Sequence, residues 1–147
     1  MKFFRIVYTA LAALLLCGCY DHKVSELGMA VADGDMEKVR QLVENGVNVN
    51  GCSGYEGCER PLEVAARYGR LEYAKFLVAH GAKINAGDIN AVYWAALNGK
   101  ADVVHYLLSK DGRLVCDKAA LASLKRDMTA KGWTQLYAEV EKTWVAP

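Results

Sequence analysis

Apolar and polar positions are arranged along this chain with the spacing of short amphipathic helices, and glycines mark where the helices end. The pattern is clearest over residues 60–85. Pro61 predicts the start of one helix, because its ring fixes φ at a helical value and its missing N–H would have no partner in a first turn. Gly69 and Gly81 predict the ends of this helix and of the next, since glycine adopts a left-handed conformation without a Cβ penalty. The second helix carries an apolar stripe near the helical period at Leu71, Ala74, Phe76, Leu77 and Val78.

This arrangement occurs three times. Its leucine, glycines and asparagine recur 35 residues upstream, at Leu27, Gly34, Gly46 and Asn50. Its paired alanines, its glycine and its helical leucine recur 30 residues downstream, at Ala95, Ala96, Gly99 and Leu107. The small alanines allow two helices to approach closely. Repeats of this kind predict helix pairs that stack on one another.

The segment from about Leu27 to Asp117 resembles an ankyrin-repeat array. The resemblance rests on Pro-Leu-x-x-Ala-Ala at residues 61–66, the glycine that follows, the helical leucine, Gly-Ala at 81–82 and the asparagine of the loop. It implies an all-α ankyrin-repeat solenoid of about three helix-turn-helix repeats, at residues 26–50, 60–86 and 90–117. Gly132 lies 33 residues beyond Gly99 between two helical patterns. Residues 118–147 are therefore expected to form a degenerate C-terminal capping repeat.

The repeats depart from the family's usual Thr-Pro-Leu-His motif. Residues 25–28 are Ser-Glu-Leu-Gly, and residues 90–93 are Asn-Ala-Val-Tyr. No repeat keeps the threonine or the histidine. Because those side chains normally form hydrogen bonds between repeats, we expect a less stable stack than a consensus array.

Residues 1–18 have the features of a secretion signal. A basic start precedes an apolar run over residues 6–16, which is too short for an ordinary transmembrane helix. The segment Leu16-Cys17-Gly18-Cys19 resembles the end of a bacterial lipoprotein signal, with Cys19 at the acylated position. Cys17 stands where Ala, Ser or Thr is usual. The alternative is a soluble secreted protein whose signal happens to end in Cys.

The lipoprotein resemblance implies a periplasmic protein that is lipid-anchored through Cys19. Tyr20 is not the Asp that retains lipoproteins in the inner membrane of enteric bacteria, so the resemblance favours the inner leaflet of the outer membrane. The tether, residues 19–25, reaches about 20 Å at about 3.3 Å per residue. The repeat stack is therefore expected to lie near the membrane.

Charge narrows the class of partner. Without residues 1–18 the chain has 16 basic and 17 acidic side chains, a net charge near −1. No basic stripe for nucleic acid is left. We therefore expect a monomer that binds another protein through local surface chemistry, and that contacts the membrane through its lipid anchor only.

Cys52 and Cys58 lie in a loop that contains three glycines. An oxidising compartment favours a disulfide between them. Cys116 is expected to be a small buried side chain. Zinc is the competing interpretation of the loop cysteines, but it needs four ligands, and the three histidines lack finger-type spacing. No metal and no cofactor is expected.

The sequence has no complete catalytic motif. Gly51-Cys52-Ser53-Gly54-Tyr55 misses the nucleophile-elbow pattern at its last position. Glu56 and Glu59 form a carboxylate pair that suits acid–base chemistry, although solvation of a loop tip is the simpler role. A phosphate-binding glycine loop, His-Glu-x-x-His and Cys-x-x-Cys are all absent. These observations favour a binding protein over an enzyme.

The ankyrin resemblance implies a partner-binding concave surface formed by loop tips and by residues just before the inter-helix glycines. Aromatic and arginine side chains usually dominate such interfaces. Carried over by position, the expected contacts are Asp33, Tyr55, Glu56, Arg67, Tyr68, Asp88, Ile89 and Asn98. Other apolar side chains at helical spacing are expected in the core and the cap, namely Trp94, Trp133, Leu136, Tyr137 and Val140.

The leading hypothesis is a non-enzymatic protein-protein interaction module. A sharper form, made by analogy with short lipoproteins of repeat fold, is an immunity protein that neutralises a periplasm-delivered effector of the type VI kind. One alternative is an envelope scaffold or stress-protection ankyrin protein. An alternative of another class is a metal- or thiol-dependent factor that uses the loop between Cys52 and Cys58.

The anchoring hypothesis predicts that Cys19→Ser abolishes acylation and leaves a precursor that the lipoprotein peptidase does not process. Labelling with radioactive palmitate measures acylation, and the wild-type chain is the positive control. A Cys19→Ser chain that still incorporates palmitate would show that another residue is the anchor.

Overall fold

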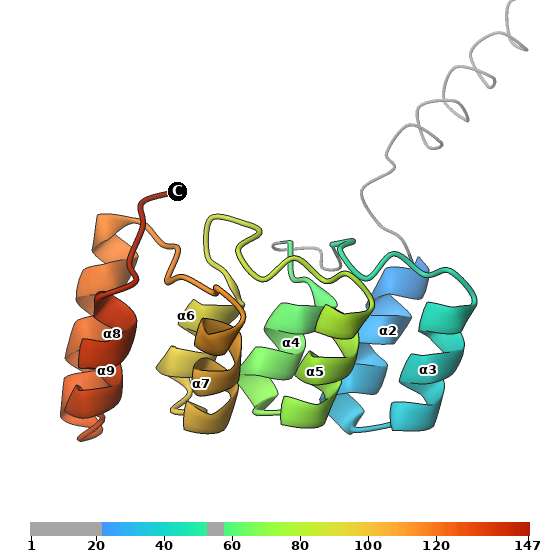
Figure 1. The fold of residues 1–147 in the computed structure, drawn as a ribbon, viewed down its shortest axis with the longest axis horizontal. Helices are drawn as coiled ribbons and strands as arrows, with labels where there is room; N and C mark the ends of the chain where they lie inside the picture. The colour runs from blue at the N-terminus through green and yellow to red at the C-terminus, as the bar shows by residue number, and fades with distance from the viewer. Residues whose placement is uncertain (1–21, 53–57) are drawn as a thin grey trace, which may run out of the picture.

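The computed structural model describes residues 22–52 and 58–147. These residues form helices and no strand, and Val115 and Val145 form an isolated parallel bridge. The helices stand in pairs along one long axis (Figure 1). They are α2 (His22–Asp33), α3 (Met36–Glu44), α4 (Pro61–Tyr68), α5 (Leu71–Ala79), α6 (Ala91–Leu97), α7 (Ala101–Ser109), α8 (Lys118–Ala130) and α9 (Thr134–Glu141). The predicted all-α repeat solenoid is confirmed.

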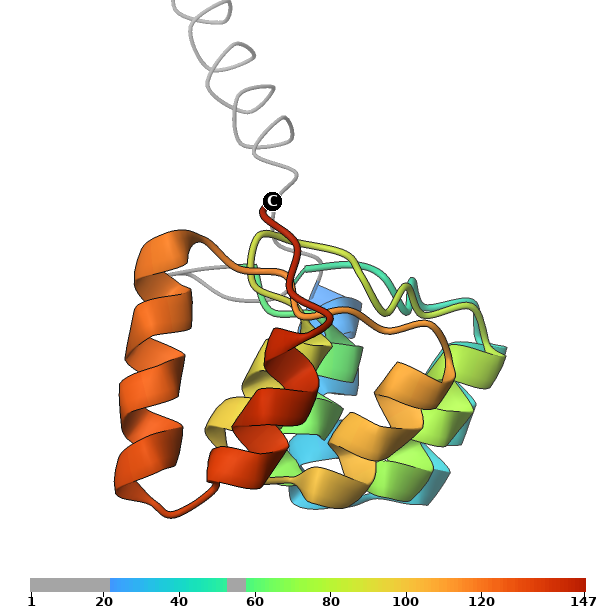
Figure 2. The ribbon, with the colours of Figure 1, turned by 60° about the vertical axis from the view of Figure 1, so that its left-hand side comes forward.

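The pairs stack in two rows. The inner helices α2, α4, α6 and α8 contact one another in that order, and α5 contacts α7 in the outer row. Figure 2 looks obliquely along the stack, with α8 and α9 at the near end and the long connecting loops along one side. None of the described helices is long and apolar enough to cross a membrane.

Small residues set the spacing of the inner row. Ala65 and Ala66 of α4 and Ala95 and Ala96 of α6 are fully buried. Because a methyl group is the whole side chain, α4 and α6 approach closely, and this contact is the most extensive between helices. Larger side chains fill the space between rows in one continuous core that includes Leu27, Leu62, Leu77, Leu107 and Leu124.

A glycine with positive φ links the two helices of each pair, and next to three of these glycines lies a side chain from the following repeat. Gly99, at φ 62°, joins α6 to α7. A Cβ added there would lie 2.5 Å from the indole of Trp133, which precedes α9. The side chains of Arg70 and Lys100 lie in the same way against Gly34 and Gly69. These glycines therefore serve both turn geometry and repeat packing.

Asparagines form hydrogen bonds between successive loops. Asn50 donates from Nδ2 to the Gly81 carbonyl at 2.9 Å and accepts the Lys83 N–H at 2.7 Å. Asn85, its counterpart 35 residues on, donates to the Asp111 carbonyl and accepts the Arg113 N–H. The same side chain thus joins two successive pairs of repeats.

Asn90 takes over the polar role of the missing threonine and histidine in the third repeat. It is fully buried at the start of α6. Its Oδ1 accepts the N–H groups of Tyr93 and Val115, and its Nδ2 donates to the carbonyls of Ile84 and Arg113. Each such bond contributes about 1 kcal/mol net. Asn90 therefore supplies hydrogen bonds to the adjacent loops, and the lower stability of the stack relative to a consensus array stays a prediction.

The C-terminal tail covers the last loop. The Val145 N–H donates to the Leu114 carbonyl at 2.8 Å, and Trp144 Nε1 donates to the Cys116 carbonyl at 2.9 Å. Cys116 is fully buried, as we predicted, and burial raises the pKa of its thiol. Residues 118–147 thus close the end of the stack, with Tyr137 and Val140 buried.

Two details differ from expectation. Helix α2 begins at His22 and includes residues 22–25, which we had assigned to the tether, because Val24 is buried in the core. Trp94 was expected in the core, but it is only partly buried. Cys19, Tyr55 and Glu56 lie outside the described residues.

The double role of Gly99 predicts that Gly99→Ala destabilises the fold more than Gly81→Ala. Both residues have positive φ, which costs an alanine about 1–2 kcal/mol. Only Gly99 would also force its new methyl group against a rigid indole, since nothing lies within 4 Å of a Cβ at Gly81. Overpacking adds about 1–3 kcal/mol. Urea denaturation of both variants measures the difference, and equal losses would exclude the packing role.

Candidate functional site

The large apolar side chains that the described residues expose are concentrated on one surface. Among them Met29 is 55% exposed on α2, Tyr68 is 49% exposed at the end of α4, and Ile89 is 37% exposed just before α6. The fourth, Val145, belongs to the C-terminal tail. We use the name inner-helix surface for the exposed side of α2, α4 and α6 together with loop residues 58–60 and 87–89.

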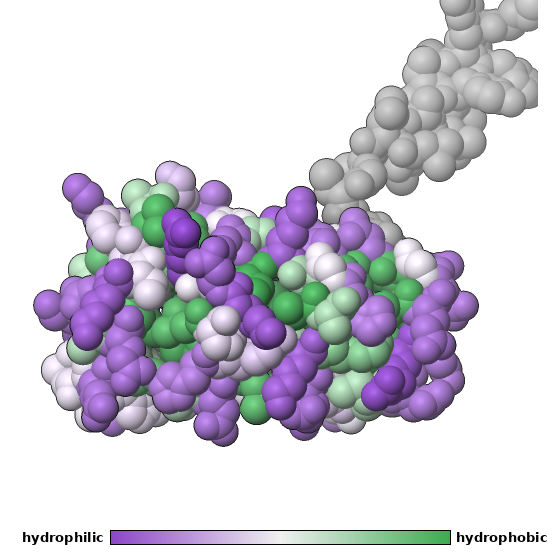
Figure 3. Space-filling view, viewed as in Figure 1, coloured by the Kyte–Doolittle hydropathy of each residue, from purple (hydrophilic) through white to green (hydrophobic). Residues whose placement is uncertain are grey.

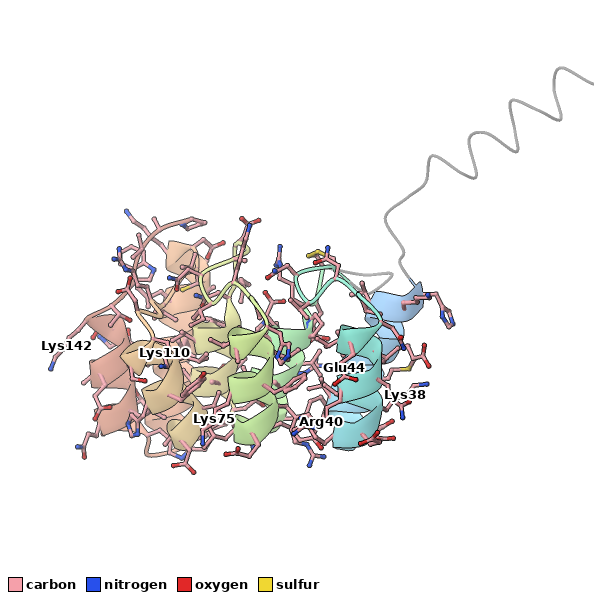
Figure 4. The ribbon with its side chains drawn as sticks, turned by 45° about the vertical axis from the view of Figure 1, so that its right-hand side comes forward. Lys38, Arg40, Glu44, Lys75, Lys110 and Lys142 are labelled. Carbon is pink, nitrogen blue, oxygen red and sulfur yellow. A yellow bond between two sulfur atoms is a disulfide. The ribbon has the colours of Figure 1, made fainter. Side chains whose placement is uncertain are left out.

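The outer helices present a different surface. Figure 4 shows charged side chains of α3, α5 and the ends of α7 and α9 extending into solvent, including Arg40, Glu44 and Lys75. Figure 3 views the molecule from the side of Figure 1, and apolar residues there are interspersed with polar ones. No large apolar side chain of α3, α5, α7 or α9 is exposed. The inner-helix surface is therefore the stronger candidate for a binding site.

A first depression of about 260 Å³ lies between α2 and α4. Two of its apolar side chains occupy one position of the repeat, since Met29 precedes Val64 by 35 residues. The aromatic ring of Tyr68 and the charged groups of Glu59 and Arg67 complete it. The lining residues are Ser25, Gly28, Met29, Ala32, Glu59, Val64, Arg67 and Tyr68.

Arg67 holds the centre of the inner-helix surface. Its Nη2 lies 3.0 Å from Glu59 Oε2, and both side chains are partly buried. Its guanidinium carbon lies 5.1 Å from the ring centroid of Tyr68 and 5.9 Å from a ring centroid of Trp94. These distances permit cation–π attraction to both rings. Arg67 therefore orders two aromatic side chains that belong to neighbouring repeats.

A second depression of about 380 Å³ lies beside the first, between the loops that precede α4 and α6. Cys58 and Arg60 come from the earlier loop, Asp88 and Ile89 from the later one, and Trp94 from α6. Cys58 is joined to Cys52 as a disulfide, with the Cα atoms 4.7 Å apart. Because both sulfurs are used in this bond, neither is a thiolate that could ligate a metal.

A buried ion pair supports this depression. Glu63 is 2% exposed, and its carboxylate accepts the Arg60 N–H at 2.8 Å and lies 3.1 Å from Arg60 Nη1. Burial raises the pKa of Glu63, and the hydrogen bonds and charge of Arg60 oppose that rise. The pair leaves no room beside Gly87, where a Cβ would lie 2.6 Å from Arg60 Nη1.

The structure brings together four of the eight residues predicted to contact a partner. Arg67 and Tyr68 line the first depression, and Asp88 and Ile89 line the second. Asp33 is exposed at the end of α2 and lines neither. The side chain of Asn98 instead donates to the Trp94 carbonyl of its own helix.

Sequence reasoning missed Met29 and Trp94 as site residues. It gave Glu59 a role in solvation of the loop tip, with acid–base chemistry as the alternative. Repeat alignment contains the missing signal, because Met29, Val64 and Trp94 occupy one equivalent position at offsets of 35 and 30 residues. Apolar residues at the same position of three repeats are expected to form a row across the inner helices. The described residues contain no group of three His, Cys, Asp or Glu side chains placed to hold a metal.

Comparison with known proteins agrees with this architecture. A family model for ankyrin repeats in three copies matches residues 7–88 and 27–119. Cyclin-dependent kinase 4 inhibitor B of Rattus norvegicus is 35% identical over 96 residues, which are 62% of this chain and 72% of the relative. The Mus musculus protein of the same name matches to the same extent.

A palmitoyltransferase of Lachancea kluyveri is 32% identical over 94 residues. The match covers 60% of this chain but 13% of that enzyme. A match to so small a part of the enzyme is no evidence that this chain has the enzyme's activity. With its helix pairs, its turn glycines and the family match over more than half of its length, the chain belongs to the ankyrin-repeat family of protein-interaction modules.

Proposed function

We propose that this protein binds another protein with its inner-helix surface and has no catalytic activity of its own. The observation that supports this most strongly is the gathering of Met29, Tyr68 and Ile89, which are exposed apolar side chains, beside the ordered Arg67. Exposed apolar side chains next to arginine and aromatic anchors are typical of protein interfaces. Relatives named as kinase inhibitors also act on another protein.

Order in the free protein favours tight binding. Arg67 is already held by Glu59 and two aromatic rings, so little rotamer freedom is lost when a partner docks. The disulfide to Cys52 likewise restrains Cys58, which directly precedes Glu59. The surface is therefore prepared for a partner rather than formed by it.

The proposal extends to location and biological role. The lipoprotein-like segment that ends at Cys19 supports anchoring in the periplasm, on the inner leaflet of the outer membrane. A binding module without a catalytic motif, held close to that membrane, suits an immunity protein that blocks a toxin delivered into the periplasm. An envelope scaffold is the alternative, and both roles use the same surface.

The binding proposal predicts that Met29→Ala combined with Tyr68→Ala weakens partner capture by at least about 2 kcal/mol, because these side chains supply exposed apolar contact area. Stability should change by less than about 1 kcal/mol, because both are half exposed. Arg67 is better left intact, since its removal would leave the partly buried Glu59 without its ion-pair partner.

The measurement is a pull-down from envelope extract, followed by titration with the captured protein. Arg40→Ala combined with Lys75→Ala changes two exposed side chains of the outer helices and serves as the matched control. Normal capture by the Met29 and Tyr68 variant would contradict the proposed surface. Equal losses in both double variants would also contradict it.

The immunity role predicts that this protein protects cells from a toxin encoded by a neighbouring gene. Cells that direct such a toxin to the periplasm should resume growth when the wild-type chain is co-expressed. The Met29 and Tyr68 variant should fail to protect at an equal protein level. A neighbouring gene for envelope biogenesis, or no protection by the wild-type chain, would favour the scaffold role.

A further inference from the structure

Some charged side chains of the inner-helix surface form ion pairs within the described chain, and one does not. Arg67 is paired with Glu59, and Arg60 is paired with Glu63, so both cations that line the depressions are neutralised within the chain. Asp88 lies in the second depression, is exposed, and forms no hydrogen bond or ion pair with any residue in 22–52 or 58–147. The depressions therefore carry one uncompensated negative charge.

The surroundings of Asp88 suit a cation. Trp94 and Ile89 line the same depression, and a tryptophan ring attracts a cation through its quadrupole. A cation bound here would contact both a carboxylate and an aromatic ring.

The opposite end of the surface is apolar. Gly28, Met29, Ala32 and Val64 supply the wall and floor of the first depression, and Tyr68 stands at its edge. Its volume of about 260 Å³ is large enough for one large apolar side chain. The ion pair of Glu59 and Arg67 belongs to this depression, and Arg67 reaches toward Trp94 of the second. The two depressions are thus adjacent but chemically different.

We propose that the partner presents a protein segment in which a lysine or arginine lies beside a large apolar residue. The cation lies over Asp88 and Trp94, and the apolar side chain enters the depression of Met29, Val64 and Tyr68. This inference rests on the proposed function and adds the chemistry of the partner. Charge complementarity selects such a segment over an acidic one, because the local cations are already paired.

The test uses a displayed library of random peptides, screened against the protein as purified from its expressing cells. Enriched peptides should contain lysine or arginine close to Leu, Ile, Met or Phe. The best peptide, made with a fluorescent label, is then titrated by anisotropy at low and high salt. Asp88→Asn should weaken its binding about threefold at low salt, and the difference should vanish at high salt because an exposed charge is screened.

Glu44→Gln is the matched control, since Glu44 is an exposed carboxylate of the outer helix α3 (Figure 4). It should leave peptide affinity unchanged. Met29→Ala combined with Tyr68→Ala should weaken binding at least tenfold. Enrichment of acidic or uncharged peptides that still need Met29 and Tyr68, or equal effects of Asp88→Asn and Glu44→Gln, would overturn this inference but keep the proposed function.

Other outcomes would overturn the proposed function itself. They are a library that yields no binder, and binders that do not respond to the Met29 and Tyr68 variant. Concentration-dependent self-association that the same variant abolishes would identify a second copy of this chain as the occupant. That result would overturn the proposed basic segment.

Discussion

Each helix pair of this protein depends on the next pair to bury its apolar side, and this dependence governs the rest of the structure. The contact between α4 and α6 shows why, because Ala65, Ala66, Ala95 and Ala96 lose all solvent exposure only when the two repeats stack. A single pair would leave that surface in water. Stability therefore comes from interfaces between neighbours along one axis. Turn glycines and loop asparagines act on the same interfaces.

Much of this fold could be predicted from glycine and alanine spacing, and the surface could be predicted less well. Gly69 and Pro61 mark backbone conformations that few other residues adopt, so they locate helix ends directly. Trp94 shows the limit. It occupies an apolar position beside Ala95 and Ala96 in the sequence, but whether a neighbour covers its indole depends on contacts between distant segments. Asn90 was missed for a related reason, since three of its four hydrogen bonds reach residues 6 to 25 positions away.

The inner-helix surface illustrates how repeats create a site without a catalytic motif. One repeat position supplies Met29, Val64 and Trp94, and differences in size at that position turn a regular row into two depressions. Arg67, three residues after Val64, adds an ion pair with Glu59 at the centre of this surface. Variation at a few exposed positions thus changes binding chemistry, whereas the buried alanines and glycines preserve the scaffold.

The C-terminal tail has a consequence for solubility. Asn50 and Asn85 lie in successive loops, and each forms hydrogen bonds with backbone groups of the loop that follows its own. The loop between α7 and α8 has no such loop after it in the described residues, and open N–H and C=O groups are a template on which another chain can add. Here Thr143 Oγ1 accepts the Leu114 N–H, and the Val145 N–H donates to the Leu114 carbonyl. The tail thereby covers backbone groups on which another chain could otherwise add.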